Sequence, residues 1–329
     1  MKTTQSVVSA LVVALFCLLA SCNENSNTVT GPQPVVIDKN VLERTAMQDG
    51  FVATELAPLT DSDNEPVDIM RHIYPSHGPR EKIKLVRKTR VISHSSSLNQ
   101  TNDTTAVLTI QKMTSGEAII AVVTVTDSSK SWVVFRKPLE ETFIRKMLFT
   151  AKKEDPDDHD DDDEHEDDDS GKVEWKKLAL SLMEGGTANR SARIVEVSIM
   201  FSDTAIVTIS SPLDFYLHWK KYKPLLPRCW KGREVQIKVR VESSKPDPDI
   251  ILVRRGNAEH GRVSTKQQLE LVSETNNNGI YDRVYEISMS PHLNKGSFHS
   301  LIEVWTHESL YDSTAQVSTH VWGMPYTVH

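Results

Sequence analysis

Hydrophobic and polar residues alternate most regularly in the second half of this chain. Four aliphatic residues, Val235, Ile237, Val239 and Val241, stand at every second position between polar or charged neighbours. Because successive side chains of a strand point to opposite faces, this pattern predicts an antiparallel strand with one buried face. Further strands are predicted over residues 194–201, 204–210, 214–219, 250–254, 268–273, 281–288, 298–305 and 316–322.

Turn signals separate these predicted strands. Residues 245–248 read KPDP and residues 277–279 read NNG, and both compositions are typical of turns. Short strands at regular spacing predict a β-sandwich. The segment NNNGIYDRVYEI resembles the turn-to-strand passage of bacterial immunoglobulin-like domains, which implies an immunoglobulin-like β-sandwich over residues 188–329. This half has only one cysteine, so a disulfide-bonded immunoglobulin domain is excluded.

The first half begins with helical periodicity and then changes to a period of two. Leu42 and Ala46 recur at helical spacing after Asp38, a suitable N-cap, and a second short helical turn is predicted over residues 67–71. Gly116 is expected to break the chain between two of the strands that follow. These strands are predicted over residues 82–93, 104–110, 118–126, 132–136, 143–150 and 173–182.

The predicted element order is short helices followed by antiparallel strands, and the last strand contains Trp175. This order resembles the α+β cone of the nuclear-transport-factor-2-like superfamily. A cystatin-like sheet fits the same element order nearly as well. Either resemblance implies a small α+β domain over residues 35–187, with an antiparallel sheet and short N-terminal helices. The fold class is therefore predicted to be mainly β, with this α+β domain followed by the immunoglobulin-like β-sandwich.

The N-terminal segment decides where the protein is located. Lys2 precedes an apolar run of 14 residues from position 7 to 20, broken only by a serine, whereas a membrane-spanning helix needs about 20 apolar residues. The run ends in Leu19-Ala20-Ser21-Cys22, which resembles the lipobox of bacterial lipoproteins. The resemblance implies that residues 1–21 are removed and that Cys22 carries diacylglycerol and an amide-linked acyl chain such as palmitate.

Two features refine the predicted location. Asn23 after the cysteine is similar to the pattern of lipoproteins sorted to the outer membrane rather than retained in the inner membrane. Residues 22–34 are polar and contain glycine and proline, so they predict a flexible tether. The alternatives are an ordinary cleaved signal peptide with an accidental cysteine, or an uncleaved anchor.

An acidic run dominates the charge of the chain. Residues 154–169 contain 13 acidic and no basic residues, although the net charge of the whole chain is only -7. The remainder is mildly basic, but its basic residues are not clustered as in nucleic-acid-binding proteins, so we expect no nucleic-acid partner. The run predicts a solvated loop that concentrates divalent cations, with Ca²⁺ or Zn²⁺ as candidate ligands. The candidate metal ligands are Asp157, Asp158, His159, Asp160, Asp161, Asp162, Asp163, Glu164, His165 and Glu166.

Few other residues suggest chemistry. Asp68, His72 and His77 are the candidates for a hydrolase pocket, but Pro75 prevents one continuous helix from carrying them. Cys229 is expected to be a buried packing residue rather than a nucleophile. No Walker loop, dinucleotide-binding glycine motif, G-x-S-x-G elbow or HExxH motif occurs.

These observations predict a lipid-anchored envelope protein with a non-catalytic binding or structural role. Its partners are expected to be the membrane, through the N-terminal lipid, and an envelope protein or glycan. The alternatives are an envelope hydrolase with a pocket in the first domain, and a surface adhesion module that acts through an exposed sheet face. No catalytic residue or resident cofactor is predicted.

Overall fold

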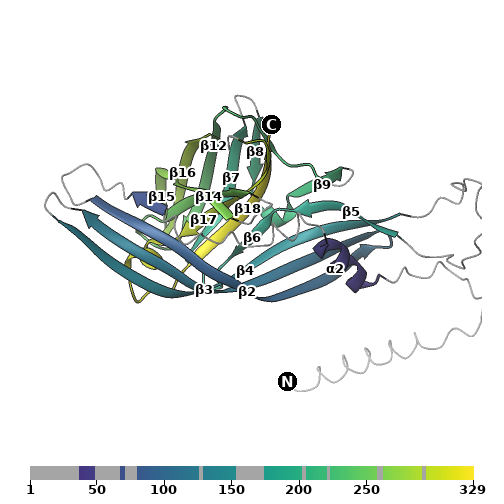
Figure 1. The fold of residues 1–329 in the computed structure, drawn as a ribbon, viewed down its shortest axis with the longest axis horizontal. Coiled ribbons are helices and arrows are strands. Elements are labelled where there is room, and N and C mark those ends of the chain that lie inside the picture. Colours follow the sequence, from purple (N-terminus) through teal and green to yellow (C-terminus); the bar gives the residue numbers. More distant parts are fainter. Residues whose placement is uncertain are drawn as a thin grey trace, which may run out of the picture. The chain divides into compact units, whose positions relative to one another are not determined.

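Two antiparallel sheets make up most of the chain that the structure describes (Figure 1). It is a computed structural model, and it describes residues 37–48, 67–70, 80–125, 129–152, 174–201, 205–220, 223–257, 262–290 and 294–329. The predicted mainly β class is therefore confirmed. Contacts group residues 37–329 into one unit. No helix among the described residues is long and apolar enough to cross a membrane.

The larger sheet contains a ribbon of three long strands. They are β2 (Arg80–Asn102), β3 (Thr105–Val125) and β4 (Lys130–Lys152). The sheet continues from β4 through β6 (Met183–Gly186), β18 (Thr319–Val328), β17 (Gly296–Trp305) and β13 (Ile250–Asn257) to β14 (Arg262–Gln268). Smaller strands join its sides: β1 (Val67–Met70), β5 (Glu174–Ser181), β9 (Tyr216–Lys220), β10 (Lys223–Pro224) and β11 (Arg228–Cys229).

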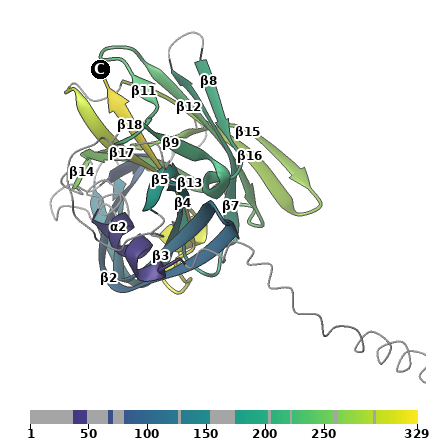
Figure 2. The ribbon, with the colours of Figure 1, turned by 90° about the vertical axis from the view of Figure 1, so that its right-hand side faces the viewer.

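The smaller sheet has five strands. In spatial order they are β15 (Glu270–Asn277), β16 (Ile280–Met289), β12 (Val235–Ser243), β7 (Ala192–Phe201) and β8 (Ala205–Ile209). The alternating segment predicted around Val239 is the central strand β12, and its aliphatic side chains are buried. They pack against residues of β13, β17 and β18 in a shared core, and Figure 2 shows the two layers face to face.

The larger sheet curls back on itself. Strands β1 and β14, at the two ends of its strand order, lie in contact. Across the described strands every pairing is antiparallel except that of β11 with β18. Strand β18 is internal to the sheet, because it pairs with β17 along its whole length on one side and with β6 and β11 on the other.

One predicted helix is confirmed and the other is wrong. Helix α2 (Lys39–Met47) is capped by the Asp38 carboxylate, which accepts a hydrogen bond of 2.8 Å from the Asn40 backbone N–H. Its buried residues Leu42 and Ala46 cover the end of the ribbon. Residues 67–70 instead form β1, because the edge of β2 offers backbone partners to this four-residue segment.

Gly116 does not break the chain as predicted. Strand β3 continues through it, paired with Thr89 on one side and Leu139 on the other. A Cβ atom at this position would lie 1.9 Å from the Lys88 carbonyl oxygen. The glycine therefore permits close approach of two backbones rather than a turn. Strand β4 is likewise continuous where two strands, 132–136 and 143–150, were expected.

Two further boundaries differ from the sequence pattern. The predicted strand 268–273 is divided at Leu269, a buried residue where the chain leaves the larger sheet at β14 and enters the smaller one at β15. The predicted domain boundary after residue 187 follows β6, which pairs with both β4 and β18. One sheet thus contains strands from both sides of that boundary, and the identity of each half as α+β or immunoglobulin-like stays a prediction.

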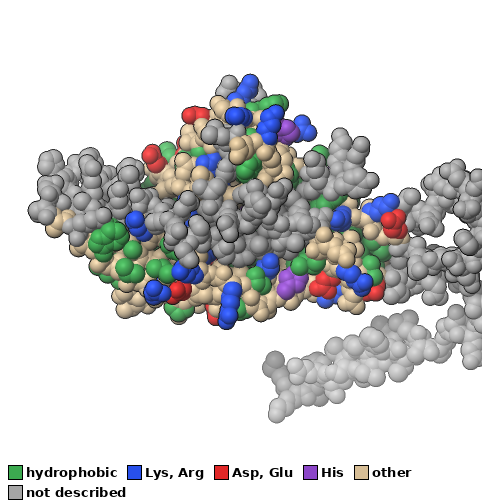
Figure 3. All heavy atoms as spheres, viewed as in Figure 1, with side chains coloured by type: hydrophobic (Ala, Val, Ile, Leu, Met, Phe, Trp, Pro, Cys, Tyr) green, Lys and Arg blue, Asp and Glu red, His purple; other side chains and the backbone are tan. Residues whose placement is uncertain are grey.

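Two short helical elements complete the described fold. Helix α4 (His307–Tyr311) follows β17, and the 3₁₀ turn η1 (Pro212–Asp214) precedes β9. The buried Lys137 ammonium of β4 donates to the Ser309 carbonyl at 2.7 Å and so holds the end of α4 against the ribbon. Away from this contact, at the start of β4, hydrophobic side chains remain on the surface (Figure 3).

Candidate functional site

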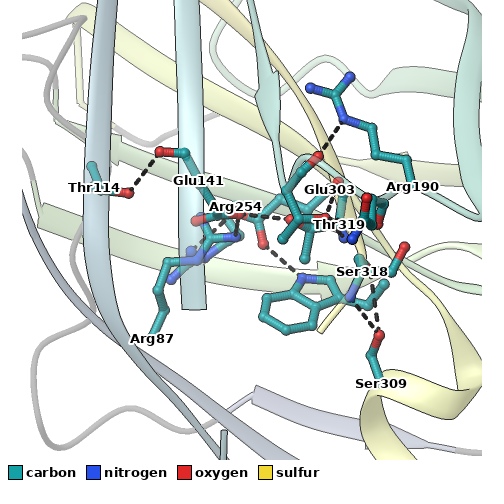
Figure 4. Close-up of polar contacts among 12 residues, drawn as sticks. Arg87, Thr114, Glu141, Arg190, Arg254, Glu303, Ser309, Ser318 and Thr319 are labelled. Atoms are coloured by element: carbon teal, nitrogen blue, oxygen red, sulfur yellow. Dashed lines mark hydrogen bonds and ion pairs between the residues drawn. The ribbon is translucent and has the colours of Figure 1, made fainter. Parts of the chain in front are cut away.

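Four charged side chains, two positive and two negative, are buried together at the centre of the ribbon's inner face. Arg87 of β2, Glu141 of β4, Arg254 of β13 and Glu303 of β17 converge there, as Figure 4 shows. The Arg87 guanidinium lies 3.0 Å from the Glu141 carboxylate and 3.0 Å from that of Glu303. Arg254 also donates to Glu303 at 3.0 Å. All four are at most 2% exposed, so these ion pairs are shielded from solvent.

Neutral groups complete this charge cluster, defined as Arg87, Glu141, Arg254 and Glu303. The Trp305 indole N–H donates to the second oxygen of Glu303 at 3.1 Å, and its ring centroid lies 5.4 Å from the Arg87 guanidinium carbon. The Thr319 hydroxyl donates to Glu141 at 2.7 Å. Two positive and two negative charges balance, and this lowers the cost of keeping them in the interior.

The two carboxylates of the cluster titrate in opposite directions. Burial raises the pKa of Glu141, and the opposing attraction of Arg87 is too small to reverse the shift. Burial acts in the same direction on Glu303, but Arg254, Arg87 and the Trp305 N–H together outweigh it and hold the pKa of Glu303 low. The cluster therefore has one firmly ionised carboxylate, Glu303, and one that is easier to protonate, Glu141.

Hydrogen bonds connect the cluster to the molecular surface. The Thr187 hydroxyl accepts from the Thr319 backbone N–H at 3.0 Å, and the Thr187 carbonyl accepts from the Arg190 guanidinium at 2.8 Å. The Arg190 guanidinium in turn lies 3.8 Å from the carboxylate of Glu184. Figure 4 shows Arg190 reaching away from the buried charges beyond Thr319. A short polar path thus joins Glu141 to Glu184.

Glu184 and Arg190 line an open polar cleft of about 820 Å³. We call it the polar cleft. Its walls come from β6, β18, β7, the end of β12 and the segment before η1. Hydroxyl groups are frequent among the lining residues, which include Ser191, Ser210, Ser211, Ser243 and Ser244. This volume is in the range of small-molecule sites in proteins.

His320 fixes the carboxylate of Glu184. The backbone N–H of Ile194 donates to His320 Nδ1 at 2.8 Å, so Nδ1 is the acceptor and the proton of the neutral ring is on Nε2. Nε2 therefore donates to Glu184 at 3.0 Å. This hydrogen bond is the main reason that the pKa of Glu184 is lowered, whereas burial lowers the pKa of His320.

This arrangement favours binding over proton transfer. Glu184 is an ionised acceptor whose side chain is 30% exposed, so it is accessible to hydroxyl or ammonium donors. Both ring nitrogens of His320 are already hydrogen-bonded, and the ring is therefore not available as a general base.

Almost all of the site residues predicted from the sequence lie outside the described part of the chain. Cys22, the candidate metal ligands between Asp157 and Glu166, and both His72 and His77 lie outside the described residues. Asp68 is placed by its backbone in β1, opposite Lys84. Among the described residues no group of three histidine, cysteine, aspartate or glutamate side chains is positioned to hold a metal ion.

Cys229 is buried and unpaired, as expected. Burial raises the pKa of its thiol to about 12, so the thiolate is scarce near neutral pH.

One feature of the sequence indicates the charge cluster. Ile83, Leu85 and Arg87 share one face of β2 and are all buried, so Arg87 continues the buried face of this strand. A charge at an interior position of an otherwise apolar alternation indicates a buried partner. Its partners are 54 and 216 residues away, and no local pattern identifies them.

No protein-family model, curated protein or solved structure matches this chain. What the fold and the site define is therefore a class: a mainly β protein with two antiparallel sheets, a buried charge cluster and a polar cleft beside it.

We expect Arg87→Leu to lower the free energy of unfolding by about 3–5 kcal/mol, because it leaves Glu141 and Glu303 without a shared counter-charge in the interior. Denaturant titration measures this loss. Arg136→Leu is the matched control, since Arg136 pairs with Glu117 at 3.1 Å with both side chains substantially exposed. That control should cost less than about 1 kcal/mol. Equal losses in the two variants would contradict a stabilising role for the cluster.

We expect His320 to make the fold sensitive to mild acid. The pKa of His320 is lowered in the folded chain. Below the ordinary histidine pKa of about 6.5, the unfolded chain therefore binds more protons than the folded chain, and acid favours unfolding. Stability is therefore full above about pH 6.5 and falls as the pH drops toward the folded pKa. Thermal unfolding midpoints measured between about pH 7 and pH 5 should fall less in His320→Gln than in the unsubstituted chain. His94→Gln, at an exposed position in β2, should behave as the unsubstituted chain does.

Proposed function

We propose that this protein is a lipid-anchored protein of the bacterial cell envelope that binds a ligand without transforming it. The location is supported by Leu19-Ala20-Ser21-Cys22, whose resemblance to a lipobox implies acylation of Cys22. Asn23 favours the outer membrane over the inner membrane. The polar residues 22–34 suit a tether between the lipid and the β body, and the acidic run 154–169 adds weak binding of divalent cations.

The polar cleft is the observation that supports a binding role. Glu184 presents an ionised carboxylate to the cleft, held by His320 and Arg190. Serine side chains line the cleft around it; Ser243 is buried, and the hydroxyls of Ser211 and Ser244 donate within the chain and keep their acceptor capacity. A carboxylate surrounded by hydroxyl groups suits a ligand that is rich in hydroxyls, so we propose an envelope glycan as the ligand.

The alternatives have less support from the described residues. A hydrolase would need a free general base. His72 and His77, the candidates for a pocket in the first domain, lie outside the described residues, and in the polar cleft the imidazole of His320 has both nitrogens engaged. An adhesion face would need clustered surface aromatics, but the exposed Trp132 lies in β4 and the exposed Trp230 lies in the loop after β11. Non-catalytic binding is therefore the proposal.

The lipid anchor is tested by substitution of its attachment residue. We expect Cys22→Ser to move the protein from the membrane fraction to the soluble fraction when membranes are washed in high salt, because the acyl chains provide the attachment that salt does not screen. Cys229→Ser, which changes a buried cysteine, is the control and should remain with membranes. If Cys22→Ser still sediments with membranes as completely as the unsubstituted protein, the proposed anchor is wrong.

The binding role is tested by titration of the Cys22→Ser chain with peptidoglycan fragments released by muramidase. We expect Glu184→Gln to weaken the affinity by about tenfold or more, because it removes an ionised hydrogen-bond acceptor. The matched control is Glu286→Gln, since Glu286 is a part-buried carboxylate of the smaller sheet that pairs with Lys238 outside the cleft. An unchanged affinity in Glu184→Gln, or no binding by the unsubstituted chain, would contradict the proposed glycan site.

A further inference from the structure

The start of β4 extends beyond the core of the molecule. Trp132, Val133 and Val134 are consecutive, and they are 50%, 51% and 56% exposed. Consecutive residues of a strand point to opposite faces, so exposure of all three means that neither face of β4 is covered here. Further along the same strand, from Lys137 to Phe149, alternate residues are buried. The ribbon therefore ends in an apolar tip, at the left of Figure 3.

The outer face behind this tip mixes apolar and basic side chains. Residues that oppose one another across neighbouring strands share a face. One row across the ribbon is Lys84, Ala121 and Val134, and the next is Val86, Ile119 and Arg136. The Lys84 ammonium lies 5.6 Å from the centroid of the Trp132 ring, which is a cation–π contact. We call the tip and this outer face the ribbon-end surface.

Positive charge predominates on the ribbon-end surface. The basic residues of its outer face are Lys84, Lys88, Arg90 and Arg136, and the acidic ones are Glu117 and Glu140. Glu117 pairs with Arg136 at 3.1 Å. These described side chains carry a net charge of +2, in a chain whose total formal charge is -7. The surface is thus locally complementary to an anionic partner although the protein as a whole is not.

We propose that the ribbon-end surface docks on anionic phospholipid headgroups. A tryptophan beside two valines suits the boundary between headgroups and acyl chains, where an amphipathic ring is favoured. The cations behind them lie where phosphate groups would be, and each basic residue near an anionic membrane adds attraction. The contact is separate from the proposed lipid at Cys22. That lipid would keep the body close to the membrane, so the ribbon-end surface would meet the headgroups at a high effective concentration.

Vesicle flotation of the chain from residue 22 onward, carrying Cys22→Ser, tests this surface without any acyl chain. Two vesicle types are compared: phosphatidylcholine alone, and phosphatidylcholine with phosphatidylglycerol in about equal amounts. We expect binding to the second type only, weakened by added salt. Trp132→Ser combined with Lys84→Gln should reduce the partition coefficient about tenfold or more, since one cation alone contributes about fivefold. Val134→Ser, an independent exposed substitution, should reduce it in the same direction.

The matched control changes the same residue types at another exposed place. Trp230→Ser combined with Lys231→Gln removes an indole that is 54% exposed and a neighbouring cation. This variant should float as the unsubstituted chain does. A loss of binding in the control but not in the Trp132 variant would overturn the assignment, as would equal binding to both vesicle types or no binding to either. Failure of the anchor at Cys22 is scored separately, by fractionation of the Cys22→Ser protein from membranes washed in high salt, which screens the docking contact.

Discussion

The buried charge cluster is the interaction on which the described fold depends. Arg87, Glu141, Arg254 and Glu303 come from four strands, and the Arg87–Glu303 pair joins positions 216 residues apart. A shift of any of these strands by one residue would turn its charge to the other face and leave the partners unpaired in the interior. The cluster therefore fixes the register between the long ribbon and the strands β13 and β17 that cover it.

The charge cluster also helps to position the residues of the polar cleft. Glu184 lies on β6, and His320 lies on β18 next to Thr319, whose hydroxyl binds the charge cluster. The position of His320 is thus set from two sides, by the cluster through Thr319 and by the Ile194 backbone in the other sheet. A carboxylate held in one orientation would lose little freedom on contact with the proposed ligand. The cost is that the imidazole has no nitrogen left for chemistry.

Local features of the sequence predicted much of the fold. The alternation around Val239, the Asp38 cap and the turn at residues 277–279 depend on neighbouring residues, and each is present in the structure. The turn places Asn278 and Gly279 at positive φ, as a tight hairpin requires. Where pairing with a distant strand decided the local structure, the prediction from the sequence pattern was wrong. Residues 67–70 became a strand because β2 lies beside them, and Gly116 stayed within a strand because Lys88 approaches it.

The candidate site was the least predictable part for the same reason. Glu184 and His320 are 136 residues apart, and neither lies in a recognisable motif. The residues that did suggest chemistry, His72, His77 and the acidic run, lie outside the described residues. Arg87 is the one residue whose neighbours indicated a buried site, because it is a charge within an apolar alternation. This pattern predicts a buried partner but does not identify the partner.

The internal position of β18 also determines when the body can fold. This strand is formed by residues 319–328 and lies between β17 on one side and β6 and β11 on the other. It carries Thr319, His320, Trp322 and Met324 into the charge cluster, the cleft and the shared core. Until these residues have been synthesised, the earlier strands have no partner at the centre of the sheet. Such long-range pairing makes folding slow and late, so the larger sheet is completed only after β18 has been synthesised.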